Sequence, residues 1–358
     1  MILYDPSLAM RFPDYGIMLP VSASRAERIL EYLDGNFVRG TRGDNMPYPG
    51  PVFDFASALS YLEEPEKTEI VTRPDLERIH GADFIGALFG DGPSESGAEY
   101  ARRGRAAGPA AVSEASGLEK ALLNAYELID SRGKPRRYEP DRAVKPLAAL
   151  FQTILAQVGG TYLACRLALA PGAGFCYYLG GGMHHARYDS GSGFCLINDV
   201  AVAFRKIQAE GRARLVWILD LDVHKGDGTA ELVRFARERG ELAPRPAGNS
   251  AVENGAATAG KPRVLTLSVH MARGWPLDEE SLARAENGRA PLVPSDIDIG
   301  IDRGEEADYV PRLAEGIAGL ENMSGTEKPD LVLVVDGADP YEHDGLPSSS
   351  LLKLSLEQ

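Results

Sequence analysis

The sequence is poor in cysteine, with only 3 cysteines among 358 residues. Cys165, Cys176 and Cys195 form no Cys-x-x-Cys pair and no regular spacing, which argues against a disulfide framework. The first residues, MILYDPSLAM, lack the basic stretch and apolar run that mark a secretory leader. An odd number of thiols without such a leader predicts a protein of the reducing cytoplasm.

Basic residues are also scarce, because 38 Lys and Arg stand against 52 Asp and Glu, for a formal net charge of −14. Clustered basic side chains are needed to bind phosphate backbones irrespective of base sequence, so we expect no nucleic-acid partner. No uninterrupted apolar run approaches the roughly 20 residues of a membrane-spanning helix, so we expect no membrane contact. The 44% hydrophobic content instead predicts a large buried core, and the charge suits a basic or neutral substrate.

Short apolar runs alternate with longer segments of helical periodicity, which indicates an α/β fold around a largely parallel sheet. Strands are predicted at Glu69–Thr72, Phe175–Leu179, Leu215–Leu221, Arg263–Val269 and Leu331–Asp336. Helices are predicted at Ser116–Ser131, Pro146–Ala170, Ile197–Gly211, Gly228–Gly240 and Glu305–Leu320. The last four strands are continuous apolar runs, which is typical of strands covered on both faces.

Two compositionally loose segments, 90–115 and 241–261, interrupt this alternation without ending it. We interpret them as surface insertions within a single domain of residues 1–358. The final residues, LPSSSLLKLSLEQ, read as the start of a helix, because serines suited to an N-cap precede several leucines. Since so short a helix is marginal in water, we expect that the chain is truncated at this end.

Polar side chains follow two of the predicted strands. The run LVWILDLDVHKGDG ends with Asp220, Asp222, His224 and Asp227, and alternate residues of an extended chain share one face. Unpaired carboxylates at a buried strand end cost several kcal/mol each, and a bound cation removes that cost. By itself the motif is also compatible with a solvated strand end capped by aspartates.

A second strand end repeats the pattern in DLVLVVDGADPYEHDG, where Asp339 closely follows an apolar run. Asp222, His224 and Asp339 would together supply two oxygens and one imidazole, leaving one position open, as in catalytic zinc sites. Taken alone, this second motif is equally an ordinary turn, since Asp-Gly and Asp-Pro both favour turns.

The stretch GGGMHHARYDSGSGFC, residues 180–195, places two adjacent histidines after three glycines in a chain with only 6 histidines. Read alone, it is either a flexible connection between a strand and a helix or part of a site. The strand ends just described favour a site, because they gather metal-binding side chains at the same edge of a parallel sheet.

Four segments, in this order along the chain, resemble successive motifs of the zinc-dependent histone deacetylase family. They are GGGMHHARYDSGSGFCLINDVAVAF, ILDLDVHKGDGTAEL, VLTLSVHMARGWP and VVDGADPYEHDGLP. That family includes bacterial acetylpolyamine amidohydrolases and acetoin-utilisation proteins. The resemblance runs from about Pro146 to the end of the sequence, with a weaker echo at Arg73–Leu88. It implies an arginase-like, three-layer α/β/α fold and the hydrolysis of an acyl amide.

By motif position, the resemblance implies a role for each member of the histidine pair. His185 would be the general base and later the acid, supported by Asp227, while His184 would be an electrostatic partner supported by Asp220. The metal at Asp222, His224 and Asp339 would be zinc, with iron(II) also compatible with two oxygens and one nitrogen. A structural potassium ion is implied near Asp220.

The resemblance further implies a narrow tunnel for an acetyl-lysine, an acetylpolyamine or a related small acyl amine. The Gly193 carbonyl would accept the substrate N–H, Phe194 would form one wall, and Trp275 would form the facing wall. The segment HMARGWP departs from the phenylalanine-containing loop usual at this place. Neither the acyl group, the amine nor the oligomeric state follows from the sequence.

One part of the family pattern is absent: the GGY segment whose tyrosine helps to stabilise the oxyanion. Residues 340–358 contain Tyr341 but no such segment, and we leave the oxyanion donor unassigned. An alternative is therefore a deacetylase-like protein that binds metal but is weakly active or inactive. A two-manganese ureohydrolase of the same fold is disfavoured, because its Asp-Ala-His-type segment is DLDVH here.

Overall fold

The computed structural model describes residues 1–19, 21–22, 24–33, 51–91, 115–130, 132–246, 260–279, 281–282 and 292–357. The two predicted insertions lie mostly outside these residues, at 92–114 and 247–259. Among the described residues, the strands form two sheets in which all pairings are parallel, as predicted. Parallel pairing brings the carboxyl ends of neighbouring strands to one edge, where α/β proteins place their sites.

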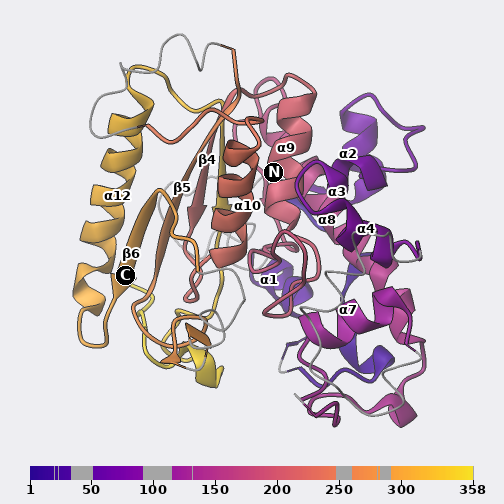
Figure 1. Ribbon diagram of the computed structural model, residues 1–358. Helices are drawn as coiled ribbons and strands as arrows, with labels where there is room; N and C mark the ends of the chain where they lie inside the picture. The colour runs from indigo at the N-terminus through magenta and orange to yellow at the C-terminus, as the bar shows by residue number, and fades with distance from the viewer. Residues whose placement is uncertain are drawn as a thin grey trace.

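The larger sheet has the order β6-β5-β4-β7 and the smaller sheet the order β2-β1-β3 (Figure 1). The strands of the larger sheet are β4 (Leu215–Asp220), β5 (Arg263–Met271), β6 (Ile297–Ile301) and β7 (Leu331–Val335). The strands of the smaller sheet are β1 (Ile2–Leu3), β2 (Val52–Phe53) and β3 (Tyr177–Tyr178). The central strand β4 places Asp220 opposite Ser268 of β5 and Val335 of β7.

Helices cover both faces of the larger sheet. On one face lie α8 (Leu150–Ala168), α9 (Asp199–Ala209) and α10 (Asp227–Glu238), and on the other lies α12 (Tyr309–Ser324), as Figure 1 shows. Alternate residues of β4 belong to the two resulting cores, with Val216 and Ile218 on the α8 side and Trp217 on the α12 side. This alternation confirms the three-layer α/β/α architecture.

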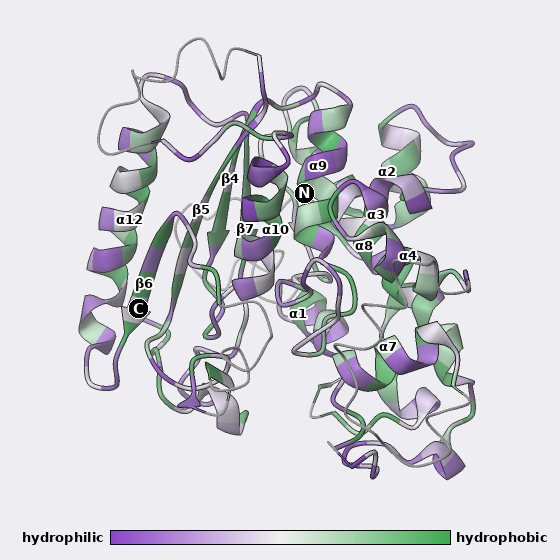
Figure 2. Ribbon diagram, in the orientation of Figure 1, coloured by the Kyte–Doolittle hydropathy of each residue, from purple (hydrophilic) through white to green (hydrophobic). Residues whose placement is uncertain are grey.

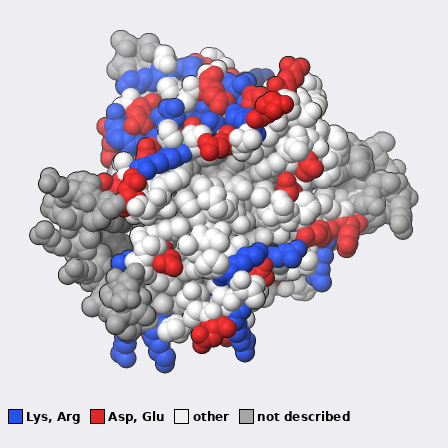
Figure 3. Space-filling model, turned by 90° about the vertical axis from the view of Figure 1, so that its right-hand side faces the viewer, with Lys and Arg blue, Asp and Glu red and all other residues white. Residues whose placement is uncertain are grey.

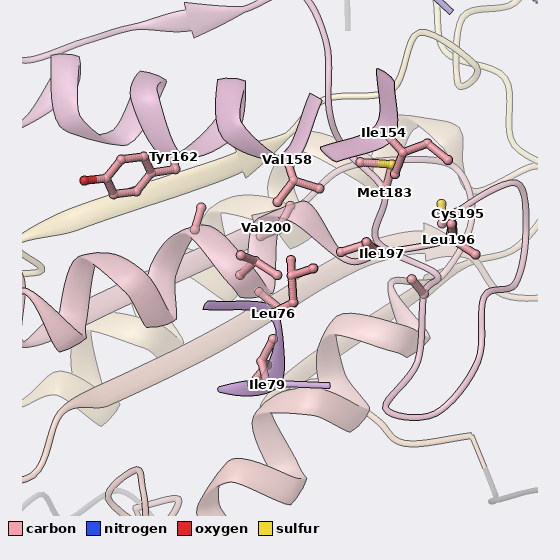
Figure 4. Close-up of a cluster of buried hydrophobic side chains, with 14 of the residues drawn as sticks. Leu76, Ile79, Ile154, Val158, Tyr162, Met183, Cys195, Leu196, Ile197 and Val200 are labelled. Carbon is pink, nitrogen blue, oxygen red and sulfur yellow. The ribbon is translucent and has the colours of Figure 1, made fainter. Parts of the chain in front are cut away.

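Helix α8 forms the centre of the larger core. Its Val158 side chain lies near Val200 of α9, and Ile154 and Tyr162 belong to the same cluster, which also holds Leu76 (Figure 4). The continuous helix Leu147–Ala168 has 22 residues and a mean hydropathy of 1.3, enough by length and composition alone to cross a membrane. Because α8 packs against α9 over much of its length, the core accounts for this apolar character.

The remaining described helices are short. They are α1 (Arg25–Leu33), α2 (Phe55–Tyr61), α3 (Arg73–Glu77), α4 (Ala82–Leu88) and α7 (Gly117–Ala125). The 3-10 turns lie at Pro6–Leu8, Phe12–Tyr15, Pro140–Arg142, Leu147–Ala149, Glu306–Asp308 and Pro347–Ser349. The five predicted helices are all present, most of them shorter than predicted; the first begins at a capping box of Ser116 and Glu119.

Three local predictions are wrong. The segment Glu69–Thr72 is not a strand, because Thr72 caps α3 in a capping box with Asp75. The final residues do not start an α-helix; a 3-10 turn is followed by a bridge between Leu354 and Tyr341. Two of the strands predicted to be covered on both faces are not: in the Phe175–Leu179 segment, which contains β3, Phe175 and Tyr177 are 65% and 37% exposed. In β7, Val332 and Val334 are 42% and 53% exposed. This strand lies at the sheet edge, while α12 packs over β5 and β6.

In Figure 2, the hydrophobic side of α12 is turned toward the sheet. On the face seen in Figure 3, acidic and basic side chains are intermixed around a central uncharged area. Among the described residues of that face, Lys and Arg form no broad basic surface.

Candidate metal and histidine site

The segment from the end of β4 to the start of α10 carries four of the predicted site residues, Asp220, Asp222, His224 and Asp227. The strand ends at Asp220, and α10 begins at Asp227, so Asp222 and His224 lie in the connection rather than in extended chain. The predicted strand alternation therefore does not place them. Hydrogen bonds within the loop place these two residues. The backbone N–H of His224 donates to Asp222 Oδ1 at 2.8 Å, and the backbone N–H of Asp222 donates to Asp220 Oδ1 at 3.3 Å.

Asp222, His224 and Asp339 converge as predicted. His224 Nδ1 lies 3.0 Å from Asp222 Oδ1 and 3.0 Å from Asp339 Oδ2. Donor atoms on a tetrahedral zinc with bonds of about 2.0–2.2 Å are about 3.3–3.6 Å apart, so a small outward shift admits the ion. Two carboxylates and an imidazole, all largely buried, fit a divalent cation, which would offset the cost of burying the carboxylates.

A glycine makes this approach of two carboxylates possible. A Cβ atom on Gly337 would collide with Asp222 Oδ2 and lie 2.8 Å from Asp339 Oδ1. Any larger residue after Asp336 would therefore push the ligands apart. The Asp336–Gly337 pair, which by itself is compatible with an ordinary turn, therefore has a steric function at the site.

The adjacent histidines form two separate histidine–aspartate pairs, as predicted. His184 Nδ1 is 2.7 Å from Asp220 Oδ2, and His185 Nδ1 is 2.9 Å from Asp227 Oδ1. The two ring centroids are 3.8 Å apart, and His184 Nε2 lies 3.7 Å from Asp222 Oδ1. Each aspartate holds an N–H on Nδ1 when the ring is neutral, leaving Nε2 to accept a proton.

The two histidines have opposite pKa shifts in the metal-free protein. Burial opposes the charged form of His184, but the carboxylates of Asp220 and Asp222 outweigh it and raise the pKa of His184 to about 10. Burial lowers the pKa of His185 well below its ordinary value, and the neighbouring His184 lowers it further. At neutral pH one ring is therefore a cation and the other a neutral base.

The metal-binding trio shows the electrostatics of an acidic site. Burial opposes the charged form of His224, but its hydrogen bonds to Asp222 and Asp339 raise its pKa to about 9. The positive rings nearby overcome the burial of Asp222 and lower the pKa of this carboxyl. The arrangement thus favours positive charge beside the two carboxylates.

The histidine loop, residues 180–188, carries His184 and His185. It is held by three residues that were not predicted from the sequence. Asn198 Nδ2 lies 3.2 Å from each of the carbonyl oxygens of His184 and Ala186. His80 Nδ1 is 2.8 Å from the Arg187 carbonyl, and its Nε2 accepts from the Asn198 backbone N–H at 3.1 Å. The buried carboxylate of Asp199 accepts the N–H groups of Gly182 and Met183 at 3.0 and 2.6 Å.

Signals for these residues were present but weak. Asn198 and Asp199 lie in the Asn-Asp pair that begins α9, and His80 lies in the segment that faintly resembled the family. A cap at the start of a helix explains Asn198 without any role in a site.

The predicted substrate-contact residues border the histidines in different ways. The Trp275 indole meets the His185 ring edge-on, with centroids 4.5 Å apart, and lies 5.7 Å from the ring of His224. The same indole touches the place where a Cβ on Gly193 would be. The Phe194 ring lies 5.2 Å below the Arg137 guanidinium and lines, with Gly193, a cavity of about 210 Å³.

Among the described residues, the aromatic contact of Tyr341 is with His343 and not with His184 or His185. Its ring packs edge-on against His343 with centroids 5.2 Å apart, and its backbone pairs with Leu354. The structure therefore offers no reason to assign Tyr341 as the oxyanion donor.

Fold and site together define a three-layer parallel α/β protein with a divalent-metal site and a histidine pair at the carboxyl ends of its strands. Residues 20–357 match the family model of the histone deacetylase domain. The chain belongs to the histone deacetylase domain family. This membership and the fold agree with the resemblance seen in the motifs.

Individual relatives cover parts of the chain. An uncharacterized protein of Picosynechococcus is 33% identical over 210 residues, 58% of this chain and 56% of that protein. The acetoin utilization protein AcuC of Bacillus subtilis is 41% identical over 199 residues, 56% of this chain and 44% of AcuC. The matches therefore span about half the length of these curated relatives.

A crystal structure of an acetylpolyamine aminohydrolase from Burkholderia pseudomallei has the same fold. It superimposes with a TM-score of 0.54 over 99% of this chain and 85% of that chain, at 17% sequence identity. At this identity the likeness supports the architecture and says nothing about the substrate.

Proposed function

We propose that the chain is a metal-dependent hydrolase of acyl amides, acting on acetyl-lysine, an acetylpolyamine or a related small acyl amine. One observation carries the proposal: a metal-binding trio lies directly beside two histidine–aspartate pairs of opposite proton affinity. Hydrolysis of an amide needs both parts, because its carbonyl must be polarised while a base removes a proton from water.

Asp222, His224 and Asp339 would hold Zn²⁺, or Fe²⁺, which two oxygens and one nitrogen also suit. The bound ion supplies a Lewis acid that polarises the carbonyl and acidifies water. Asp220 and Ser268, paired across β4 and β5, border the place proposed for a structural potassium ion. By resemblance to the family, backbone carbonyl groups of Asp222, His224, Ser268 and Val269 would hold the ion together with Asp220.

His185 acts as the general base, because its lowered pKa leaves Nε2 free at neutral pH and Asp227 holds the ring in place. It then returns the proton to the leaving amine. His184, whose raised pKa keeps it protonated in the metal-free protein, stabilises negative charge that develops on the carbonyl oxygen. The difference between the rings comes from the Asp220 and Asp222 carboxylates, which raise the pKa of His184, and from burial and the neighbouring His184, which lower the pKa of His185.

Gly193 and Trp275 position the substrate in this proposal. The Gly193 carbonyl accepts the amide N–H, and Trp275 excludes water from the side of His185, which its indole already covers. Phe194 forms another wall beside the cavity. The three cysteines are free thiols, which supports the cytoplasm as the proposed compartment.

The second candidate is a metal-binding protein with little or no turnover. The observation in its favour is the position of Tyr341, whose ring contacts His343 instead of the histidine pair. Without a tyrosine hydroxyl as oxyanion donor, a loss of about 10²–10³ in kcat is the expected order of magnitude.

The two candidates are separated by metal-reconstituted protein and a panel of acetyl-lysine peptides, acetylpolyamines and small acyl amides. The hydrolase predicts one metal ion per chain and product in a single-turnover assay, which His185→Ala abolishes. Stoichiometric metal without product would favour the non-catalytic protein. No metal binding at all would contradict both.

A further inference from the structure

The segment that follows the ligand Asp339 folds back over the metal site. Ser348 Oγ lies 3.2 Å from His224 Nε2, although the two residues are 124 positions apart. His224 Nδ1 faces both carboxylates, so it must be the unprotonated donor when a cation is bound. Nε2 then carries the proton and donates it to Ser348 Oγ, which fixes both the tautomer and the plane of the ring.

Lys353 holds the other end of this segment to the ligand loop. Its Nζ lies 3.4, 3.4 and 3.1 Å from the carbonyl oxygens of Asp339, Tyr341 and Asp344. It also lies 2.9 Å from Ser349 Oγ. An ammonium group has three protons, so it shares them among four oxygens that all belong to residues 339–349. Lys353 thereby holds residues 339–349 together through hydrogen bonds to one ammonium group.

The segment itself is anchored in the core. Leu352 is fully buried in the cluster that covers the α12 side of the sheet. Leu354 donates its N–H to the Pro340 carbonyl at 2.7 Å and accepts from the Glu342 N–H at 2.8 Å. The buried Leu352 therefore fixes the chain between Ser348 and Lys353. From there Ser348 contacts the ring of His224, and Lys353 contacts the carbonyl of Asp339.

We propose that Ser348 and Lys353 are positioning residues for the metal ligands His224 and Asp339. The inference rests on the metal site of the proposed function and deepens it. Ser348 orients the imidazole, and Lys353 sets the backbone from which the Asp339 carboxylate projects toward Val223 and His224. Hydrogen-bond partners of metal ligands typically contribute about 10–100-fold to metal affinity.

Metal titration of the apo chain tests Ser348. We expect Ser348→Ala to weaken Zn²⁺ binding, measured by competition with a chromophoric chelator, by about 10–100-fold. In Co²⁺-loaded protein the visible absorption band, which reports ligand geometry, should shift. Ser348→Thr keeps the hydroxyl and should restore both properties. Ser350→Ala, which removes another exposed serine of the same segment, is the matched control and should bind like the parent chain.

Lys353→Met, which removes the charge at similar length, should weaken Zn²⁺ binding roughly tenfold or more. Lys353→Arg should retain most of the affinity, and Lys328→Met, at an exposed lysine, should change nothing. If Lys353→Met fails to fold, the Ser348 series decides alone, because that side chain is not part of the core.

The outcomes for the inference and for the proposed function differ. If the parent chain binds Zn²⁺ and Co²⁺ but Ser348→Ala and Lys353→Met bind them equally well with unchanged spectra, the positioning roles are overturned while the metal site stands. If the parent chain binds neither ion, the proposed function fails, and the positioning roles fail with it.

Discussion

The two halves of the metal site are built in different ways. Asp222 and His224 follow β4, a central strand whose six residues are all buried between two helical layers. Asp339 follows β7, an edge strand with two exposed valines, in a loop closed by Lys353. The strand before Asp222 and His224 is thus covered on both faces, whereas the strand before Asp339 is covered on one face only. In both halves the ligand itself is oriented by polar contacts, those of the loop after β4 and those of Lys353.

Removal of a ligand from either half should have the largest effect. Asp222→Ala and Asp339→Ala should each reduce bound metal from one ion per chain to nearly none. Turnover should fall roughly 10³-fold or more, since the metal supplies several kcal/mol of transition-state stabilisation. Elemental analysis of dialysed protein measures the metal content. Retention of a full equivalent in Asp339→Ala would show that the edge-strand half is dispensable.

His184 and His185 lie beside the half of the site that follows β4. Substitution of either histidine should lower turnover and leave the metal content unchanged. His185→Ala should lower kcat/KM by about 10²–10⁴, as expected for loss of a general base. His184→Ala should cost no more than His185→Ala, because its role is electrostatic. Steady-state kinetics together with metal content measures both effects. Loss of metal in either variant would mean that a ligand had been mistaken for a base.

His80, which ties the histidine loop to α9, should make stability depend on pH. Burial lowers its pKa from 6.5 to about 4. Between these values the unfolded chain binds a proton that the folded chain does not, so stability falls as pH falls from about 6.5 to about 4. The expected contribution is about 3 kcal/mol.

Urea unfolding of the parent chain and of His80→Gln at pH 7 and pH 5 measures this contribution. The variant should lose less stability between the two pH values than the parent chain does. An equal loss would assign the acid sensitivity to other groups.

A Val→Ala substitution made once in β4 and once in β7 compares the packing of these two strands. Its expected effects are the smallest of those predicted here. Val216→Ala in β4 removes buried methyl groups and should lower the free energy of unfolding by about 2 kcal/mol. Val334→Ala in β7 removes half-exposed ones and should cost less than about 0.5 kcal/mol. Urea denaturation of both variants measures the difference. Equal losses would show that β7 is covered in solution.

Much of the site followed from the sequence for a chemical reason. Metal ligands and bases must be carboxylates or imidazoles, and these stand out directly after apolar strands and in the His184–His185 pair. Asp222, His224 and Asp339 meet as the two strand ends predicted, and both histidine–aspartate pairs form as the family resemblance implied. The larger sheet followed likewise, because a buried parallel strand such as β4 is almost entirely apolar.

Two other features required the tertiary structure. The exposure of β7 depends on its place at the sheet edge, which its apolar sequence does not reveal. The final residues look like a helix start, yet Leu352 finds a place in the core and Leu354 pairs with Tyr341. In both cases long-range packing outweighed the local pattern.

The sequence by itself determined which side chains can do the chemistry: two carboxylates and an imidazole for a metal ion, and two histidines backed by aspartates. Only the tertiary structure decided what holds them, namely Asn198 and His80 on the histidine loop and Ser348 and Lys353 on the ligands. The physical reason is that most of these supports bind backbone carbonyl oxygens or N–H groups. Nearly every residue carries such groups, so their partners are set by distance in space and leave no pattern along the chain.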